Sequence, residues 1–421
     1  MKLHRKPIPV KEAVSKVMER MKKNSHERVN LENSHNRYLG EDITASHPIP
    51  PFDKSPYDGF ALHSTDTIGL GRGQAEEFRV IEQIGAGHRA SRPLKKGEAV
   101  RIMTGAEIPE GADCVAMFEI CQAYEKNGQS YMSLKRELKP GQNVIHQGSE
   151  TKKGTVLVQS GTKINPGIKA LLATFGYDQV KVQRKPKVGI FATGTELLDV
   201  DESLEPGKIR NSNAYMITAQ VERAGAEAVY LGKLKDDFST CFEAVSKAAA
   251  EMDILITTGG VSVGDFDLMP DIYKELGAEV LFNKIAMRPG SVTTVAEVEG
   301  KLLFGLSGNP SACYVGFELF TFPIIQGFLA NPFPFRRRTK AYLNKDFPKA
   351  NPFMRFVRGK VTMRDGKIFA SPAGIDKSAV VTSLAETDAF IVLPGGTKGF
   401  KLGDMVEVIL IEDSGKQEAF H

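Results

Sequence analysis

The middle of the chain alternates between apolar runs and amphipathic segments. Short apolar runs, most of which end in a glycine turn, occur at 187–194, 226–234, 253–260 and 301–310. Segments with helical apolar spacing follow them, at 214–225, 238–252, 267–277 and 311–320. Strands that alternate with helices favour a parallel sheet with right-handed crossovers. We therefore predict an α/β domain over residues 181–330.

The flanking regions follow a different pattern. Near the N-terminus apolar residues recur at helical spacing, at Val10, Val14, Val17, Met18 and Met21. Residues 46–60 contain four prolines, which exclude a regular helix there. From there to about Val182, and again after residue 340, short β-type runs alternate with turns, with one helix expected around 164–176. The predicted fold class is therefore α/β plus β, with several domains.

Residues 331–340 combine prolines with three consecutive arginines, Arg336 to Arg338. Proline and clustered charge are typical of a linker between domains. We interpret the arginine run as a solvated surface segment and not as a site for a polyanion.

The composition is that of an ordinary globular protein. Of the 421 residues, 41% are hydrophobic and 25% are charged, which excludes collagen-like, disordered and disulfide-scaffold chains. The 55 Lys and Arg nearly balance the 51 Asp and Glu, so the net charge of +4 gives no indication of nucleic acid. The first ten residues lack the apolar core of a signal peptide, and no run approaches the roughly 18 apolar residues of a membrane span. With four cysteines and no CxxC pair, we expect a cytoplasmic protein with reduced thiols and neither nucleic acid nor membrane as a partner.

Three glycine turns follow predicted strands of the α/β domain, at 192–196, 257–267 and 305–312. Because ligands bind open α/β sheets at the carboxyl ends of strands, all three turns should line one crevice. Glycines let backbone N–H groups approach an anion, and the following helix N-termini add partial positive charge. The pattern favours an anion or phosphate site over simple strand–helix connections. The expected contacts are Gly194, Gly259, Gly260, Ser262, Gly308, Asn309 and Pro310.

Acidic residues gather at the same turns. Glu196 follows the first turn, Asp265 and Asp267 follow the second, and Asp236 and Asp237 follow another strand. One of Asp236 and Asp237 is expected to cap a helix. No histidine occurs between His146 and His421, so chemistry here depends on carboxylates, amines, hydroxyls, backbone N–H groups or an oxygen-held metal. Several carboxylates beside an anion would repel it unless a hard cation bridges them. This favours a Mg²⁺ site over the alternative that these carboxylates only cap helices.

Other candidate residues have two possible roles. Lys284 and Arg288, four positions apart, could clamp an anion or form a solvated pair at the end of a strand. Asp58 and Thr104 lie in turn-rich motifs of the N-terminal half, where each could be only a turn residue.

Six motifs, in order along nearly the whole chain, resemble those of one family. They are PPFDKSPYDGFA at 50–61, RIMTGAEIPEGAD at 101–113, FATGTEL at 191–197, TTGGVSVGDFD at 257–267, the segment 284–290, and GLSGNPSA at 305–312. Together they resemble the molybdopterin molybdenumtransferases, which include the MoeA proteins and the gephyrin E domain.

This resemblance implies a fold and a reaction. The implied domains are a discontinuous N-terminal domain (1–45 and 140–180), a β-rich insertion (46–139), a molybdopterin-binding α/β domain (181–330) and a C-terminal β domain (331–421). The implied reaction takes adenylylated molybdopterin and molybdate, transfers molybdenum to the pterin and releases AMP, with Mg²⁺. An elongated homodimer with its cleft between subunits, and contact with the molybdopterin adenylyltransferase, are implied as well.

The resemblance also assigns roles residue by residue. It implies catalytic roles for Asp58, Thr104, Glu196 and Asp267, with Glu196 and Asp267 as the metal ligands. It also implies a catalytic role for one of Asp236 and Asp237, and we take Asp237. It makes Lys284, Arg288 and Ser378 substrate contacts.

The chain departs from the family pattern at several positions. Pro56, Tyr57 and Ser307 replace the usual residues of their motifs, and Arg288 and Ser291 stand where lysine is common. The detailed molybdate contacts, and the preference for molybdate or tungstate, therefore stay open.

Two alternatives compete with this interpretation. The molybdopterin adenylyltransferase, which catalyses the preceding step, shares the α/β domain but would need no more than that domain. A gephyrin-like scaffold is the other, and the chain lacks the long linker and second enzyme domain that such a role would favour.

Overall fold

The computed structural model describes residues 6–21, 25–71, 73–234, 237–260 and 268–412. The chain forms two compact units: unit 1 is Met1–Glu41, Gly161–Asn165 and Gln179–His421, and unit 2 is Asp42–Ser160 and Pro166–Asp178. Within the described ranges, no helix is long and apolar enough to cross a lipid bilayer. The domain boundaries implied by the family resemblance stay a prediction.

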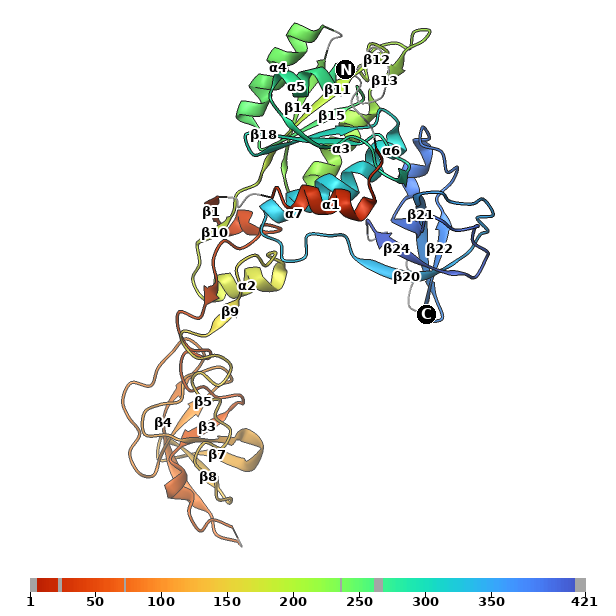
Figure 1. The fold of residues 1–421 in the computed structure, drawn as a ribbon. Helices are drawn as coiled ribbons and strands as arrows, with labels where there is room; N and C mark the ends of the chain where they lie inside the picture. The colour runs from red at the N-terminus through yellow and green to blue at the C-terminus, as the bar shows by residue number, and fades with distance from the viewer. Residues whose placement is uncertain (1–5, 22–24, 72, 235–236, 261–267, 413–421) are drawn as a thin grey trace. The chain divides into compact units, whose positions relative to one another are not determined.

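Unit 1 contains a six-stranded sheet in the order β14-β11-β15-β19-β18-β16 (Figure 1). β14, β11, β15 and β19 are parallel, as the alternation of strands and helices predicts, whereas β18 runs antiparallel to both of its neighbours, β19 and β16. The reason is the two-residue turn Glu299–Gly300, with φ of 49° and 74°, which joins β18 to β19 directly and leaves no room for a crossover helix. The strand bounds are β11 (Lys187–Thr193), β14 (Glu227–Leu234), β15 (Ile254–Thr258), β16 (Glu279–Phe282), β18 (Thr294–Val298) and β19 (Lys301–Leu306).

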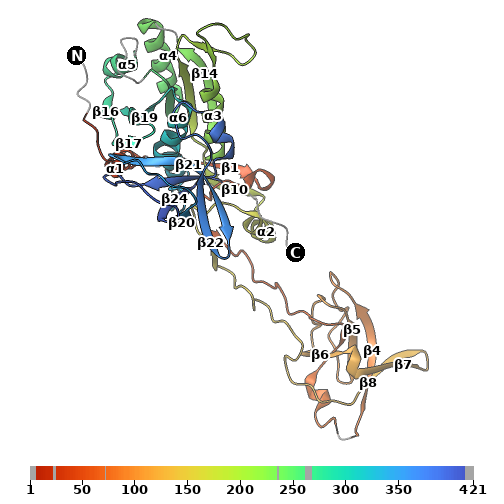
Figure 2. The same ribbon diagram turned by 90° about the vertical axis from the view of Figure 1, so that its right-hand side faces the viewer.

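Helices cover both faces of this sheet, and Figure 2 shows the same layers from the side. Ile254 and Ile256 of β15 pack into a core with α3, α6 and α7, while Leu255 between them packs into a second core with α4 and α5. Burial on both faces explains why these strands read as continuous apolar runs. The helices are α3 (Ser212–Arg223), α4 (Phe238–Glu251), α5 (Met269–Glu275), α6 (Pro310–Gly316) and α7 (Phe322–Phe328).

The N-terminal helix predicted from apolar spacing is α1 (Val10–Met18), and its Ala13 and Val17 join the first of these cores. Farther along unit 1, β1 (His26–Asn30) pairs antiparallel with β10 (Gln179–Gln183), and η1 (Leu31–Ser34) follows β1. The short strands β12 (Leu197–Leu198) and β13 (Ile209–Arg210) pair beside the sheet.

A π-helical turn, η4 (Phe317–Thr321), joins α6 to α7. It carries Glu318, whose buried carboxylate contacts Arg223 and, at 2.8 Å, Arg336. The prediction of a solvated arginine run is therefore wrong for Arg336, because a buried carboxylate requires a cationic partner. Arg337 is exposed, as predicted.

The C-terminal part of unit 1 is a closed β-barrel. Its sheet runs β21-β22-β20-β24-β23, and β23 pairs again with β21, so the five strands leave no free edge between them. β17 (Met287–Arg288), which comes from the α/β part of the chain, pairs with β21. The bounds are β20 (Arg338–Leu343), β21 (Met354–Arg364), β22 (Lys367–Pro372), η5 (Thr382–Glu386), β23 (Ala389–Leu393) and β24 (Met405–Leu410).

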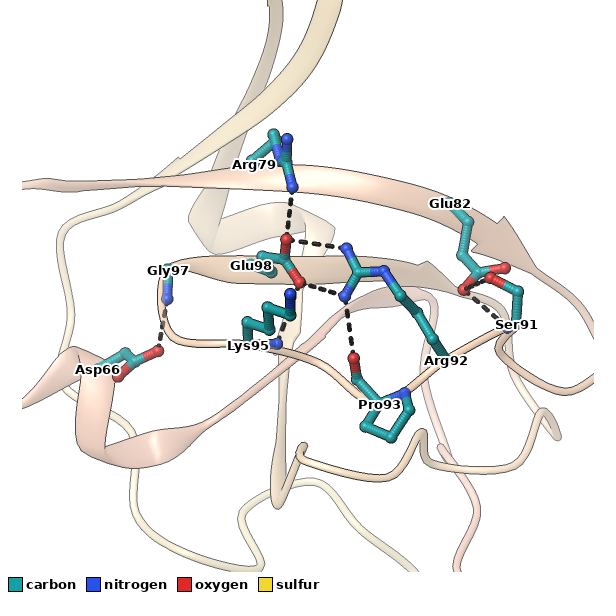
Figure 3. Close-up of polar contacts among 9 residues, drawn as sticks. All are labelled: Asp66, Arg79, Glu82, Ser91, Arg92, Pro93, Lys95, Gly97 and Glu98. Atoms are coloured by element: carbon teal, nitrogen blue, oxygen red, sulfur yellow. Dashed lines mark hydrogen bonds and ion pairs between the residues drawn. The ribbon is translucent and has the colours of Figure 1, made fainter.

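Unit 2 is built on a six-stranded sheet in the order β6-β3-β5-β4-β8-β7, as the β-type runs predict. Apolar side chains of β3 and β5 pack on both faces of this sheet. Glu98 at the start of β5 joins Arg79 of β4 to Arg92 in the preceding loop (Figure 3). The elements of unit 2 are β2 (Ile43–Thr44), β3 (Gly59–Leu62), η2 (Ser64–Thr67), β4 (Glu76–Ile84), β5 (Glu98–Ile102), β6 (Cys114–Met117), η3 (Phe118–Ile120), β7 (Cys121–Lys126), β8 (Gln129–Leu134), β9 (Val156–Val158) and α2 (Pro166–Thr174).

Candidate active site

The three glycine turns of unit 1 converge on one cleft of about 670 Å³. They follow β11, β15 and β19, three neighbouring parallel strands whose carboxyl ends lie at one edge of the sheet. Of the expected contacts, the cleft is lined by Gly194, Gly259, Gly260, Gly308, Asn309 and Pro310. Ser262 lies outside the described residues. The cleft is in the size range of sites for small molecules and cofactors.

Close packing of the backbone makes glycine necessary in the second turn. Gly259 and Gly260 have φ of 93° and 64°. A Cβ on Gly259 would lie 2.7 Å from the carbonyl oxygen of Thr193, and one on Gly260 would lie 2.8 Å from its Oγ1. The Thr193 hydroxyl itself donates to the carbonyl of Thr258 at 3.2 Å. The two turns are thus locked together, with their backbones exposed to the cleft.

Two buried side chains of the cleft carry oxygen atoms without a hydrogen-bond partner among the described residues. Asn213, 9% exposed, donates from Nδ2 to the carbonyl of Gly308 at 2.8 Å, while its Oδ1 is unpartnered. Oγ1 of Thr258, 2% exposed, is unpartnered as well. Unpaired buried polar atoms are costly, so a bound ligand that donates hydrogen bonds here would satisfy them. Nothing in the local sequence marked Asn213 as a site residue beyond its place at a helix start.

The acidic residues predicted at this rim have different environments. Glu196 lines the cleft and is exposed. Asp237 caps α4, because its Oδ2 accepts from the backbone N–H of Thr240 at 2.8 Å and from the Thr240 hydroxyl. These two hydrogen bonds, the hydroxyl's first, lower the pKa of the Asp237 carboxyl. Asp236, Asp265 and Asp267 lie outside the described residues.

A second cavity, of about 560 Å³, adjoins the first and shares Val292, Ser307 and Asn309 with it. Its lining includes Arg288 and Ser378, both expected from the family motifs. The side chain of Lys284 is not among the described lining residues of either cavity, although its carbonyl accepts from Ile8 at 3.1 Å. Its predicted anion-binding role stays a prediction.

Strand pairing between the α/β part and the barrel builds this second cavity. β17 pairs with β21 in parallel, and this places Arg288 directly beside Arg355. Arg355 also lines the cavity and donates to Oδ2 of Asp376 from Nε at 2.9 Å and from Nη2 at 2.5 Å. Two guanidinium groups on adjacent strands concentrate positive charge that an anion can neutralise. Arg355 was not predicted from the sequence, because no local pattern indicates that residues 287–288 pair with residues 354–355.

Ser378 lies in a loop that several hydrogen bonds hold in place. Arg358, 2% exposed, donates from Nη2 to the carbonyls of Ile375 at 3.0 Å and Lys377 at 3.2 Å. The N–H of Ser311 in α6 donates to the carbonyl of Ser378 at 3.0 Å. Burial lowers the pKa of Arg358 even though it faces Asp376. The loop is therefore fixed from both the barrel and the α/β part.

In unit 2 the structure brings together Asp58 and Thr104, which are 46 positions apart. The backbone N–H and the hydroxyl of Thr104 donate to Oδ1 of Asp58, at 2.7 and 2.8 Å. These bonds, the backbone one first, lower the pKa of the Asp58 carboxyl. Both side chains are exposed, so Asp58 presents an ionised, oriented carboxylate to solvent. The two residues thus form one group, which their separate motifs did not indicate.

Comparisons with known proteins cover nearly the whole chain. Three family models match in order: the MoeA N-terminal region (domain I and II) at residues 8–176, a probable molybdopterin binding domain at 189–327, and the MoeA C-terminal region (domain IV) at 340–411.

Individual relatives agree with the family models. The chain is 58% identical to the molybdopterin molybdenumtransferase of Bacillus subtilis (strain 168), over 98% of this chain and 96% of that protein. It is 49% identical to the enzyme of the same name from Staphylococcus aureus (strain COL), over 98% of both. Among solved structures, the molybdopterin biosynthesis MoeA protein from Pyrococcus horikosii matches with a TM-score of 0.86 and 30% identity, over 97% of this chain and 100% of that one.

Proposed function

The chain belongs to the family of molybdopterin molybdenumtransferases, the MoeA proteins, and we propose that it inserts molybdate into adenylylated molybdopterin and releases AMP. The observation that carries this proposal is the pair of adjoining cavities that share Val292, Ser307 and Asn309. One has glycine turns suited to phosphate groups, and the other has arginines suited to a small oxyanion. Two anionic substrates held side by side would react as one complex, and this lowers the entropic cost of their encounter.

Each substrate has candidate contacts in this proposal. Backbone N–H groups of the turns at Gly194, Gly259 and Gly308 would donate to phosphate oxygens. The unpartnered oxygens of Asn213 and Thr258 would accept hydrogen bonds from the N–H groups of the pterin. Arg288 and Arg355, with the Ser378 hydroxyl, would hold the molybdate dianion. Asp58 and Thr104, with Glu196 and Asp267, keep the catalytic roles that the family motifs give them.

Magnesium is part of the proposal. No group of three or more Asp, Glu, His or Cys side chains able to cage a metal occurs within the part of the chain that the structure describes. Mg²⁺ does not need such a cage, because it commonly uses one or two carboxylates, phosphate oxygens and water. The exposed carboxylate of Glu196 in the cleft fits that donor set, and Asp267 would be the second ligand by its motif. When bound, the ion would neutralise negative charge on the substrate phosphates.

The working form in this proposal is a cytoplasmic homodimer that contacts the molybdopterin adenylyltransferase. Its four cysteines are free thiols, which supports a reducing compartment. Asp58 and Thr104 of one subunit would complete the cleft of the other.

Reconstitution tests the reaction. The purified chain is incubated with adenylylated molybdopterin, molybdate and Mg²⁺, and AMP and molybdenum cofactor are measured. We expect both products to form in equal amounts and to require all three components. Formation of adenylylated molybdopterin from ATP and molybdopterin would instead support the adenylyltransferase alternative, and no turnover with either substrate pair would support a scaffold.

Mixing two inactive variants tests the shared cleft. Asp58→Ala and Asp267→Ala each damage both clefts of a homodimer, but a heterodimer would have one intact cleft and should regain part of the activity. Subunit exchange is verified first by pull-down of differently tagged chains. Verified heterodimers without recovered activity would show that each cleft is built within one chain.

A further inference from the structure

Lys349 lies where the second cavity, lined by Arg288, Arg355 and Ser378 and called the oxyanion cavity from here on, meets a further hollow on the barrel surface. This groove, of about 640 Å³, runs between residues 344–349 and 371–376. The cavity and the groove share Lys349, Arg355 and Asp376. The side chain of Lys349 is therefore within reach of an ion in either hollow.

The segment that carries Lys349 is anchored on both sides. Phe347 exchanges two backbone hydrogen bonds with Phe400, at 2.7 and 2.9 Å. Two residues after Lys349, the N–H of Asn351 donates to Thr397 at 3.0 Å, and its carbonyl accepts from Gly396 at 2.6 Å.

A close backbone contact with Gly399 also holds this segment in place. Gly399, with φ of 126°, approaches so closely that a Cβ there would lie 2.7 Å from the carbonyl oxygen of Phe347. Lys349 is exposed, but it extends from a fixed stretch of backbone. Its side chain therefore starts from a fixed point on the wall that the cavity and the groove share.

The acids around this junction already have partners. Oδ2 of Asp376 accepts two hydrogen bonds from Arg355, and its Oδ1 lies 3.3 Å from Nη1 of Arg358. Oδ1 of Asp346, on the groove, accepts from the N–H of Leu402 at 2.6 Å. Lys349 has no ion-pair partner within the described residues, so its charge is available to a ligand.

The net charge of the barrel also favours an anion in the oxyanion cavity. Residues 340–411 contain 11 Lys and Arg against 7 Asp and Glu, a net charge of +4, which equals that of the entire chain. The α/β part of the chain contributes Arg288 and the neutral Ser291 to the lining of the cavity. A dianion that has only Arg288 and the partly neutralised Arg355 as cations would gain from a third.

We propose that Lys349 is an oxyanion-binding residue that supplies this third cation. This inference rests on the proposed function, because it takes molybdate as the ligand of the cavity. Lys349 contacts the oxyanion from the barrel part of the cavity lining, together with Arg355.

Molybdate binding to the full-length chain tests the inference, by equilibrium dialysis with the metal quantified by mass spectrometry. Lys349→Gln should raise the molybdate Kd by about tenfold or more, since a charge-assisted hydrogen bond is lost. Lys349→Arg should stay close to wild type. Lys345→Gln is the matched control, because Lys345 lines only the groove, and it should change the Kd by less than about threefold.

Two further measurements separate binding from folding. In turnover, Lys349→Gln should raise KM for molybdate while kcat and the KM for adenylylated molybdopterin stay unchanged, and its thermal midpoint should equal that of wild type. Its molybdate affinity should also depend less on salt. If Arg288→Ala weakens binding but Lys349→Gln binds molybdate like wild type, the inference is wrong and the proposed function stands. If the wild-type chain binds no molybdate, both are wrong.

Discussion

Glu98 offers a quantitative test of what holds unit 2 together. Its side chain is 7% exposed, and its two oxygens accept from Arg79 at 2.5 Å, from Arg92 at 2.7 and 2.9 Å, and from the N–H of Lys95 at 3.0 Å (Figure 3). These contacts join the loop before β5 to β4, and β5 leads directly to Thr104. Replacing the carboxylate by an amide, Glu98→Gln, keeps the shape and removes the charge.

The pKa of this carboxyl sets the size of the effect. The Arg92 hydrogen bonds, followed by those of Arg79 and Lys95, lower it from 4.5 to about 2. At 1.36 kcal/mol per pKa unit, this difference lets the ionised carboxylate contribute at most about 3.4 kcal/mol to the free energy of unfolding. Arg79 and Arg92 are 46% and 39% exposed, so water screens part of the attraction. We expect Glu98→Gln to destabilise unit 2 by about 1–3 kcal/mol at pH 7.

The expected pH dependence follows from the direction of the shift. Because folding lowers this pKa, the stabilisation is complete above about 4.5 and is lost as the pH falls towards about 2. Native-state hydrogen exchange of the β4 and β5 amides at pH 7 measures the stability difference between wild type and Glu98→Gln. Calorimetry of the same two proteins at decreasing pH shows whether this difference shrinks. Glu76→Gln, an exposed glutamate on β4, is the control and should stay within about 0.5 kcal/mol. Equal stability of Glu98→Gln and wild type at pH 7, or a difference that persists unchanged at pH 2, would refute the reasoning.

Three further predictions concern the candidate site. Glu196→Gln, or excess EDTA, should lower the rate of AMP release by at least about tenfold, equivalent to 1.4 kcal/mol of transition-state stabilisation, and full activity after either treatment would remove the metal role. Arg288→Ala should raise the molybdate Kd by about tenfold or more, with the loss smaller in high salt, whereas unchanged binding in dialysis would make Arg288 a surface residue. Thr104→Val removes one of the two hydrogen bonds to Asp58 and should lower kcat by at least about threefold with no change in thermal midpoint; Thr104→Ser should restore most of the rate, and failure of that rescue would argue against the hydroxyl's role.

Local pattern was sufficient for the architecture of the α/β part and for the glycine turns. Continuous apolar runs at β11, β15 and β19 and the helical spacing between them indicate buried parallel strands with crossover helices, because burial on both faces leaves that pattern in the sequence. Glycines directly after those strands mark where the backbone must turn at the same edge of the sheet. The family resemblance, drawn from six such local motifs, is confirmed by matches over nearly the whole chain.

Pairings between distant segments had to come from the tertiary structure. Three such features leave no periodic signal: the reversed direction of β18, the buried Glu318 that holds Arg336, and the hydrogen bonds between Asp58 and Thr104. Each depends on which surfaces meet once the chain has folded.

The oxyanion cavity shows the distinction most clearly. The sequence alone indicated that Lys284 and Arg288, four positions apart, belong to a family motif, and the family resemblance implied that Ser378 contacts the substrate. Only the register between β17 and β21 decided that Arg288 lies beside Arg355, and only the closed barrel brought Lys349 and Ser378 to the same wall. Register and barrel closure are set by the packing of whole faces against each other, to which every residue of the strands contributes, so no single stretch of sequence encodes them.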